Sequence, residues 1–243
     1  MRRSRDDWCG RSESLSVRAS RNGDPLIWCY CRHIQIPQTN TPARISPPIR
    51  DLARELVPGG RLEFISARPC PSARPNECVE AVQAQVRDHG GVICCGWRIL
   101  EWPTVLVEGE FHAVWKDPER RLLDVSHQPQ GVTRTLFVSD PDMTYEGRQR
   151  DNVRRPLRDG DAVRKLIQAS EALFELMNRG ERADQHGEIR LSGTDAEEFA
   201  GIQKEIVSAF AELQSTPLSR LGRKDPCHCG SGKRFKRCCM IGD

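Results

Sequence analysis

Four closely spaced cysteines near the end of the chain restrict the local fold more than any other feature of the sequence. They lie in "GRKDPCHCGSGKRFKRCC", residues 222–239, with the spacing C-x-C-x8-C-C, and are Cys227, Cys229, Cys238 and Cys239. Thiolates are soft ligands that suit tetrahedral Zn(II), and structural zinc sites usually close with four protein ligands. A segment this short buries too little apolar surface to fold alone, so metal binding would supply its folding free energy. The spacing therefore predicts a zinc site, with His228 as the alternative to Cys239 for the fourth ligand.

The charges around these cysteines complement a metal–thiolate site. Four cationic side chains in the same loop would offset the negative charge of four thiolates, and they are Lys233, Arg234, Lys236 and Arg237. The segment resembles the SEC-C motif, named for the C-terminal tail of the bacterial preprotein translocase motor. The resemblance implies Zn(II) bound by the four cysteines and a basic module that docks onto proteins or the ribosome. It covers only the end of the chain, and nothing upstream resembles the motor ATPase, so translocation is not implied.

The rest of the composition predicts a protein of a reducing compartment. The chain contains eleven cysteines, and its first segment, "MRRSRDDWCGRSESLSVRAS", lacks the apolar stretch of a secretion signal. No apolar run approaches the roughly 20 residues that span a bilayer. We therefore expect a cytoplasmic protein whose cysteines bind metal or act in catalysis rather than form disulfides.

The formal net charge of +3 does not mark a dedicated nucleic-acid binder. The basic tail permits such binding, but it offers one aromatic residue, Phe235, on which a base could stack. A protein or ribosomal partner is therefore favoured over nucleic acid, and the sequence leaves the oligomeric state open. Near the N-terminus, "WCYCRH" carries metal-ligand side chains in Cys29, Cys31 and His33, but this spacing matches no compact zinc knuckle.

The middle of the chain predicts an α+β fold. "NECVEAVQAQVRDHGG", residues 76–91, has the pattern of a helix with Asn76 as its N-cap and a glycine pair at its end. Four strand-like segments follow, at residues 91–100, 104–115, 121–126 and 133–140. A helix followed by antiparallel strands predicts a small α+β domain. We expect a weakly ordered segment at 1–48, the α+β domain at 49–150, a two-helix segment at 151–215 and the zinc knuckle at 216–243.

Three residues of the predicted α+β domain have the form of a nucleophilic triad. Cys78 is the second residue of the predicted helix, where backbone N–H groups and the helix dipole favour a thiolate. His112 and Asp124 follow on neighbouring strands. If "KDPER" is a five-residue loop, His112 stands directly opposite Asp124 and the two share a face of the sheet. A four-residue loop would send Asp124 through to the other face and break the triad.

This order of residues resembles the papain-like superfamily in its transglutaminase-like and NlpC-like branches. The resemblance implies Cys78 as nucleophile, His112 as base and Asp124 as the group that orients the imidazole, in acyl transfer on an amide. In the alternative interpretation, Cys78 is a small buried hydrophobe and His112 a hydrogen-bonded structural residue. The sequence thus supports a zinc-binding SEC-C protein that docks onto a partner, and, as a second hypothesis, a cysteine hydrolase or acyltransferase whose tail recruits the substrate.

Overall fold

The computed structural model describes residues 17–19, 25–30, 39–185, 188–215, 223–224 and 233–237. The described residues form four α-helices, nine strands and two short 3-10 helices, which confirms the predicted α+β class. The predicted zinc ligands, together with Cys31 and His33, lie outside the described residues. None of the helices in the described part of the chain combines the length and the apolar character that crossing a bilayer requires.

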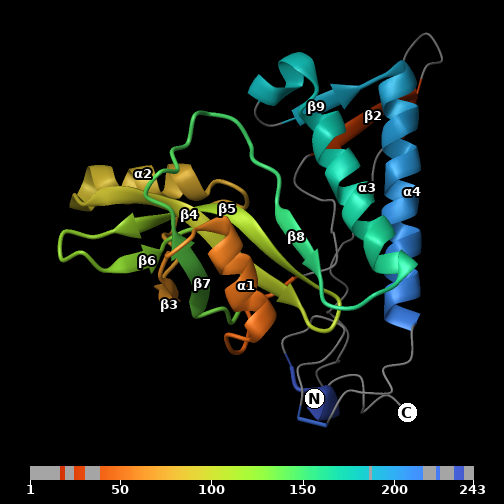
Figure 1. The fold of residues 1–243 in the computed structure, drawn as a ribbon. Helices are drawn as coiled ribbons and strands as arrows, with labels where there is room; N and C mark the ends of the chain where they lie inside the picture. The colour runs from red at the N-terminus through yellow and green to blue at the C-terminus, as the bar shows by residue number, and fades with distance from the viewer. Residues whose placement is uncertain are drawn as a thin grey trace, which may run out of the picture.

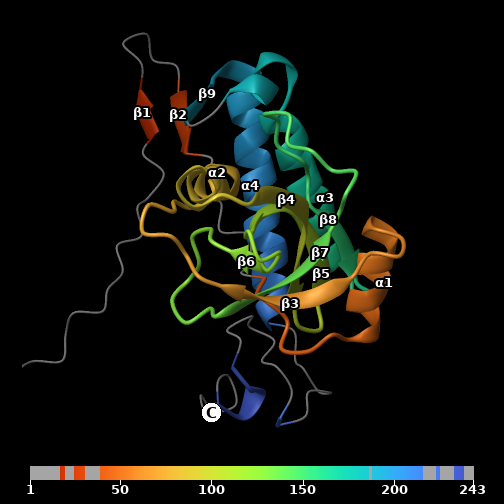
Figure 2. The same cartoon turned by 90° about the vertical axis from the view of Figure 1, so that its left-hand side faces the viewer.

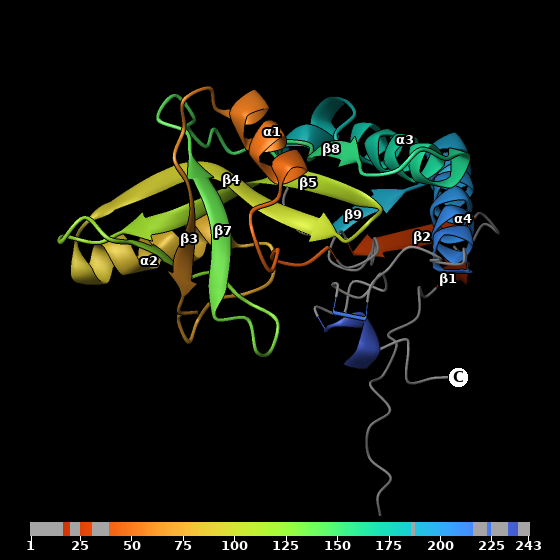
Figure 3. The same cartoon turned by 60° about the horizontal axis from the view of Figure 1, so that its bottom comes forward.

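The centre of the molecule is a small β-barrel (Figure 1). Five strands close it in the order β4, β7, β3, β6, β5 and back to β4. Their bounds are β3 Leu62–Ala67, β4 Val92–Trp102, β5 Leu106–Lys116, β6 Leu122–Asp124 and β7 Arg134–Ser139. All neighbouring pairs are antiparallel except β3 and β6. Figure 3 shows β3 and β7 running across the long β4–β5 hairpin, as the steep strand tilt of a small barrel requires.

Two helices cover the outer face of this barrel. α1 (Pro47–Leu56) begins with two prolines, which the first helical turn tolerates because its N–H groups have no intrahelical acceptor. Its Ile49 and Leu52 are buried against outward-facing residues of β4, β5 and β7. α2 (Cys78–His89) buries Val79 and Val82 against Ala113 of β5. The helix starts at Cys78 with Glu77 as N-cap, so the predicted cap at Asn76 is wrong by one residue.

Two further helices pack beside the far end of the β4–β5 hairpin (Figures 1 and 2). α3 (Asp161–Met177) and α4 (Gly193–Ser215) share a core with the hairpin residues Trp102, Val105 and Leu106. The 3-10 helix Gly180–Asp184 follows α3, and a second, Phe235–Arg237, lies in the tail. β8 (Val153–Pro156) extends the barrel sheet at β5. A separate antiparallel sheet has the order β1 (Val17–Ala19), β2 (Pro25–Tyr30), β9 (Glu188–Leu191).

The structure contains all four strands predicted for residues 91–140, as β4 to β7. It adds β1, β2, β3, β8 and β9, which the sequence pattern had not identified as strands, and the first two lie in the segment expected to be weakly ordered. β3 matters most for the site, because it lies between β6 and β7 and completes the barrel.

Candidate active site

His112 and Asp124 are in contact inside the barrel. The distance between His112 Nε2 and Asp124 Oδ2 is 3.1 Å, and the two side chains are 3% and 0% exposed. The imidazole comes from β5 and the carboxylate from the last residue of β6. Two of the three residues predicted from the sequence are therefore neighbours in space.

The register that brings them together differs from the expected one by two residues. β5 pairs Trp115 with Leu123, whereas direct opposition of His112 and Asp124 would pair Trp115 with Arg121. The predicted opposition is therefore wrong. The loop still has five residues, but they are Asp117–Arg121 rather than 116–120. Because the shift is even, both side chains stay on one face and the imidazole reaches the carboxylate diagonally.

The Asp124 carboxylate accepts hydrogen bonds from several residues besides its contact with His112. Thr135 Oγ1 donates to Oδ2 over 2.6 Å and Gln128 Nε2 over 2.8 Å. Oδ1 accepts hydrogen bonds from the hydroxyl and the backbone N–H of Ser126, at 2.6 and 3.1 Å. A buried carboxylate with this many donors is fixed in position and stays ionised. Ser126, Gln128 and Thr135 were not predicted as members of the site, and Thr135 reaches it only through the fold.

The electrostatics of the pair favour an imidazolium–carboxylate state. Burial and the charge of Arg98 lower the pKa of His112, but hydrogen bonds with Asp124 and Cys78 and the charge of Asp124 outweigh them and raise it to about 9. Burial alone would raise the pKa of Asp124; hydrogen bonds from His112, Ser126 and Thr135 instead hold it well below its usual range. The charged form of each group is thus the stable one in the folded protein.

Cys78 completes the group from the N-terminus of α2. It is the first residue of the helix, its side chain is half-buried, and it is close enough to the His112 side chain to raise the pKa of the imidazole. Asp124 engages Nε2 of the imidazole and not Nδ1. Asn76, two residues before Cys78, takes a positive φ of 62°, a conformation that asparagine tolerates better than most residues. This turn brings the chain into the helix that carries the thiol.

An interruption in strand pairing lies at the same place. Along one edge, β5 pairs with β6 at Trp115 and Lys116 and with β8 at 106–109. Within the described chain, residues 110–114 have no ladder partner on that edge, and His112 is at the centre of this stretch. Next to it on the inner face, Arg98 donates to Glu110 over 2.6 and 3.0 Å.

This arrangement has the parts needed for thiol chemistry. A thiol at a helix N-terminus is next to an imidazole, and a buried carboxylate fixes the orientation of that imidazole. No group of metal-ligand side chains that could hold an ion occurs among the described residues.

The comparisons with known proteins point to the SEC-C motif and to the translocase subunit SecA. One SecA match covers 54% of this chain, so the expectation that nothing upstream of the tail resembles that protein is wrong. Residues 223–241 match the family model described as the SEC-C motif, so the chain carries this motif. A 142-residue stretch is 30% identical to the protein translocase subunit SecA of Nitratidesulfovibrio vulgaris, covering 54% of this chain and 15% of that protein. SecA of Cupriavidus taiwanensis is 37% identical over 75 residues, 30% of this chain and 8% of SecA.

A short stretch of the chain also matches a smaller protein. The UPF0225 protein VV1358 of Vibrio vulnificus is 62% identical over 26 residues, which cover 11% of this chain and 16% of that protein. The chain thus spans less than a fifth of the length of these relatives. No solved structure matches. The comparisons do not support the resemblance to papain-like hydrolases. The evidence for thiol chemistry is therefore the geometry of the site alone.

Proposed function

We propose that the protein binds Zn(II) through its SEC-C tail and uses the loaded tail to dock onto a protein or ribosomal partner. The match over residues 223–241 supports this proposal, because it includes Cys238 and Cys239 and, with Cys227 and Cys229, all four proposed thiolate ligands. The cations of the same loop suit an acidic partner surface or ribosomal RNA and proteins. The cytoplasm supplies both the reducing conditions and such partners.

Zinc stoichiometry tests the first part of this proposal. Native mass spectrometry of the full chain should find one Zn(II), which a Cys227→Ser/Cys229→Ser variant loses. Cys70→Ser is the matched control, because Cys70 is a buried free cysteine of the folded domain. Comparison of Cys239→Ser with His228→Ala identifies the fourth ligand. A full chain that purifies without Zn(II) and gains none on addition would refute the metal site.

Sedimentation with purified ribosomes tests the second part. The zinc-loaded chain should co-sediment in low salt, and the Cys227→Ser/Cys229→Ser variant should stay in the supernatant. If neither sediments, the ribosome is not the partner and docking to a protein remains to be tested by the same variant pair.

A second candidate function follows from one observation, the contact among Cys78, His112 and Asp124. We propose that this site performs acyl transfer on an amide, as a hydrolase or an acyltransferase. His112 holds, as an imidazolium, the proton that Cys78 has lost, and the thiolate sulfur of Cys78 attacks the carbonyl carbon. The C–N bond breaks, the amine leaves with the proton from His112, and a thioester on Cys78 remains. Water or a second amine then attacks the thioester and regenerates the thiol.

Alkylation of Cys78 as a function of pH tests this site on zinc-loaded protein. Iodoacetamide should label Cys78 rapidly well below about pH 8.5, where an ordinary thiol is mostly protonated. His112→Ala should abolish this advantage, with Cys70 as the internal control. Peptide mapping after incubation with p-nitrophenyl acetate should then find an acetyl group on Cys78. Slow labelling until the protein unfolds would mean that Cys78 is only a packing residue.

A further inference from the structure

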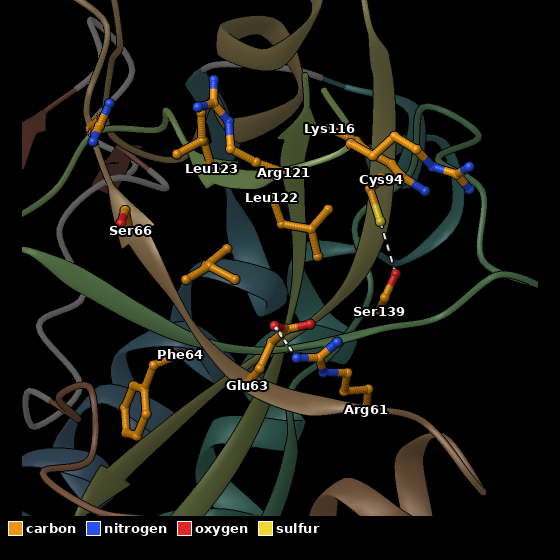
Figure 4. Close-up of a pocket in the computed structure, with 13 residues that line it drawn as sticks. Arg61, Glu63, Phe64, Ser66, Cys94, Lys116, Arg121, Leu122, Leu123 and Ser139 are labelled. Atoms are coloured by element: carbon orange, nitrogen blue, oxygen red, sulfur yellow. Dashed lines mark hydrogen bonds and ion pairs between the residues drawn. The ribbon is translucent and has the colours of Figure 1, made fainter. Parts of the chain in front are cut away.

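A pocket opens at one end of the barrel (Figure 4). Its volume is about 500 Å³, within the range of small-molecule sites. Strands β3, β4, β5, β6 and β7 all contribute to its walls. Along β5, Lys116 lines the pocket, Val114 follows in the fully buried barrel core, and His112 lies two residues further. The cluster of Val114, Ile65 and Phe137 therefore separates this pocket from the candidate active site.

Positive charge dominates the lining. It contains five cationic side chains and one carboxylate, namely Arg61, Arg68, Lys116, Arg120, Arg121 and Glu63. Glu63 pairs with Arg61 at 3.4 Å, and Arg121 is held by Asp117 at 2.7 Å. Arg68, Lys116 and Arg120 have no ion pair within the part of the chain that the structure describes. Three cations around one cavity repel each other unless an anion is present.

The loop that presents Arg120 is built at a conformational cost. Asp117 accepts hydrogen bonds from the backbone N–H of Arg121 at 2.8 Å and from its guanidinium, and the Asp117 carboxylate is buried. Arg120 has a φ of 67°, in the left-handed region where glycine would be free of strain. An arginine there is strained, because its Cβ crowds the backbone in this conformation. Strain of this kind is often retained at functional sites.

The other side of the pocket offers polar and apolar contacts. Ser139 Oγ and Cys94 Sγ lie 2.8 Å apart at its wall, which leaves the hydroxyl able to accept or donate a further hydrogen bond. Ile65, Leu122 and Leu123 add an apolar surface. A ligand that fits both parts combines an anionic head with an organic body.

We propose that this pocket binds a small phosphate-bearing molecule of about nucleotide size. Lys116, Arg120 and Arg68 would hold the phosphate oxygens, with Ser139 as an additional donor. Guanidinium groups match phosphate by paired N–H donors. Three uncompensated cations favour a di- or triphosphate over a monocarboxylate, whose single charge would leave most of the repulsion in place.

Calorimetric titration of the full chain at low salt tests the proposal, with inorganic pyrophosphate and ADP as phosphate probes. Citrate, a tricarboxylate of comparable charge, tests whether charge alone is sufficient for binding. Pyrophosphate and ADP should each bind once per chain, and citrate at least tenfold more weakly. Lys116→Gln/Arg120→Gln should weaken both phosphate probes at least tenfold. Arg68→Gln, which leaves the strained loop intact, should weaken them as well.

The matched control variant removes two positive charges outside the pocket. Arg50 and Arg74 are exposed and lie outside the pocket, so Arg50→Gln/Arg74→Gln should leave the affinities unchanged. Absence of pyrophosphate and ADP binding would overturn the proposal. So would citrate binding of equal strength, or an equal loss in the control, which would mean that net charge alone attracts the anions.

Discussion

Thr135 of β7 donates a 2.6 Å hydrogen bond to Asp124 of β6, although β3 lies between these two strands. The bond therefore crosses the inside of the barrel, and both side chains are completely buried. It joins the candidate active site to the strand that closes the barrel. The orientation of the carboxylate toward His112 thus depends on barrel closure as well as on the β5–β6 hairpin.

Replacement of this hydroxyl should weaken the site without changing its shape. Thr135→Val removes a donor to a buried carboxylate and should lower the free energy of unfolding by about 1–3 kcal/mol. Urea denaturation measures the change. Thr133→Val is the control, because Thr133 is exposed and should cost less than about 0.5 kcal/mol. Equal effects of the two variants would show that the Thr135 bond contributes nothing.

The His112–Asp124 pair should make stability depend on pH. The pKa of His112 is raised from its ordinary 6.5 to about 9, so the stabilisation that its proton brings is complete below 6.5 and disappears as the pH rises through 9. The pKa of Asp124 is lowered, so its contribution is present above its ordinary 3.8 and is lost as the pH falls below that value. The difference in unfolding free energy between wild type and His112→Gln should therefore be largest between pH 3.8 and pH 6.5.

Denaturant titrations across this pH range measure that difference. At its maximum it should be on the order of 3 kcal/mol, because the variant leaves a buried charge without its partner. His127→Gln, at an exposed histidine, is the control and should not alter the pH profile. A difference that grows rather than shrinks toward pH 9 would contradict the assigned charge state.

Gly96 should resist substitution because of its surroundings in β4. A Cβ at this position would collide with the backbone carbonyl of Val138 and approach Phe137 Cζ to 2.7 Å. Gly96→Ala should therefore destabilise the barrel by at least about 2 kcal/mol, measured by thermal unfolding. Gly201→Ala, in α4 with open space around it, should instead stabilise by about 0.5–1 kcal/mol. A tolerated Gly96→Ala would mean that β4 and β7 are less closely packed than described.

Trp102 should couple the barrel to the helical pair. Its side chain is 1% exposed and its ring lies 5.5 Å from that of Phe210 in α4. Trp102→Ala should cost about 3–5 kcal/mol of unfolding free energy. Val207→Ala, on the exposed side of α4, should change it by less than about 0.5 kcal/mol. Hydrogen exchange should show α3 and α4 opening more readily in the Trp102 variant, and equal exchange would argue against coupling.

The sequence predicted the parts of the fold that depend on local patterns. Alternating apolar residues located β4 to β7, and the helix before them placed Cys78 close to its observed position. β3 was missed because it pairs only with strands far along the chain, one of them in parallel. The register of β5 and β6 was wrong because the buried Asp117 side chain organises the turn one residue later than the sequence suggested.

The sequence predicted His112 and Asp124 as members of the candidate site, but not the residues that hold the Asp124 carboxylate in place. The even spacing of His112 and Asp124 kept them on one face despite the wrong register. Thr135 gave no signal, because its contact with Asp124 exists only after the barrel closes. The zinc ligands, including Cys227 and Cys239, lie outside the described residues, so that site stays a prediction.

The parallel pairing of β3 with β6 should be the slow event in folding. Ser66 and Leu123 are paired but lie 57 residues apart in the chain, whereas β4 and β5 form a continuous hairpin. Distant contacts require the closure of long loops and form late in folding. The hairpin should therefore form early, and β3 should dock last. Because this docking also encloses Asp124, the candidate active site would be assembled in the final, rate-limiting step of folding.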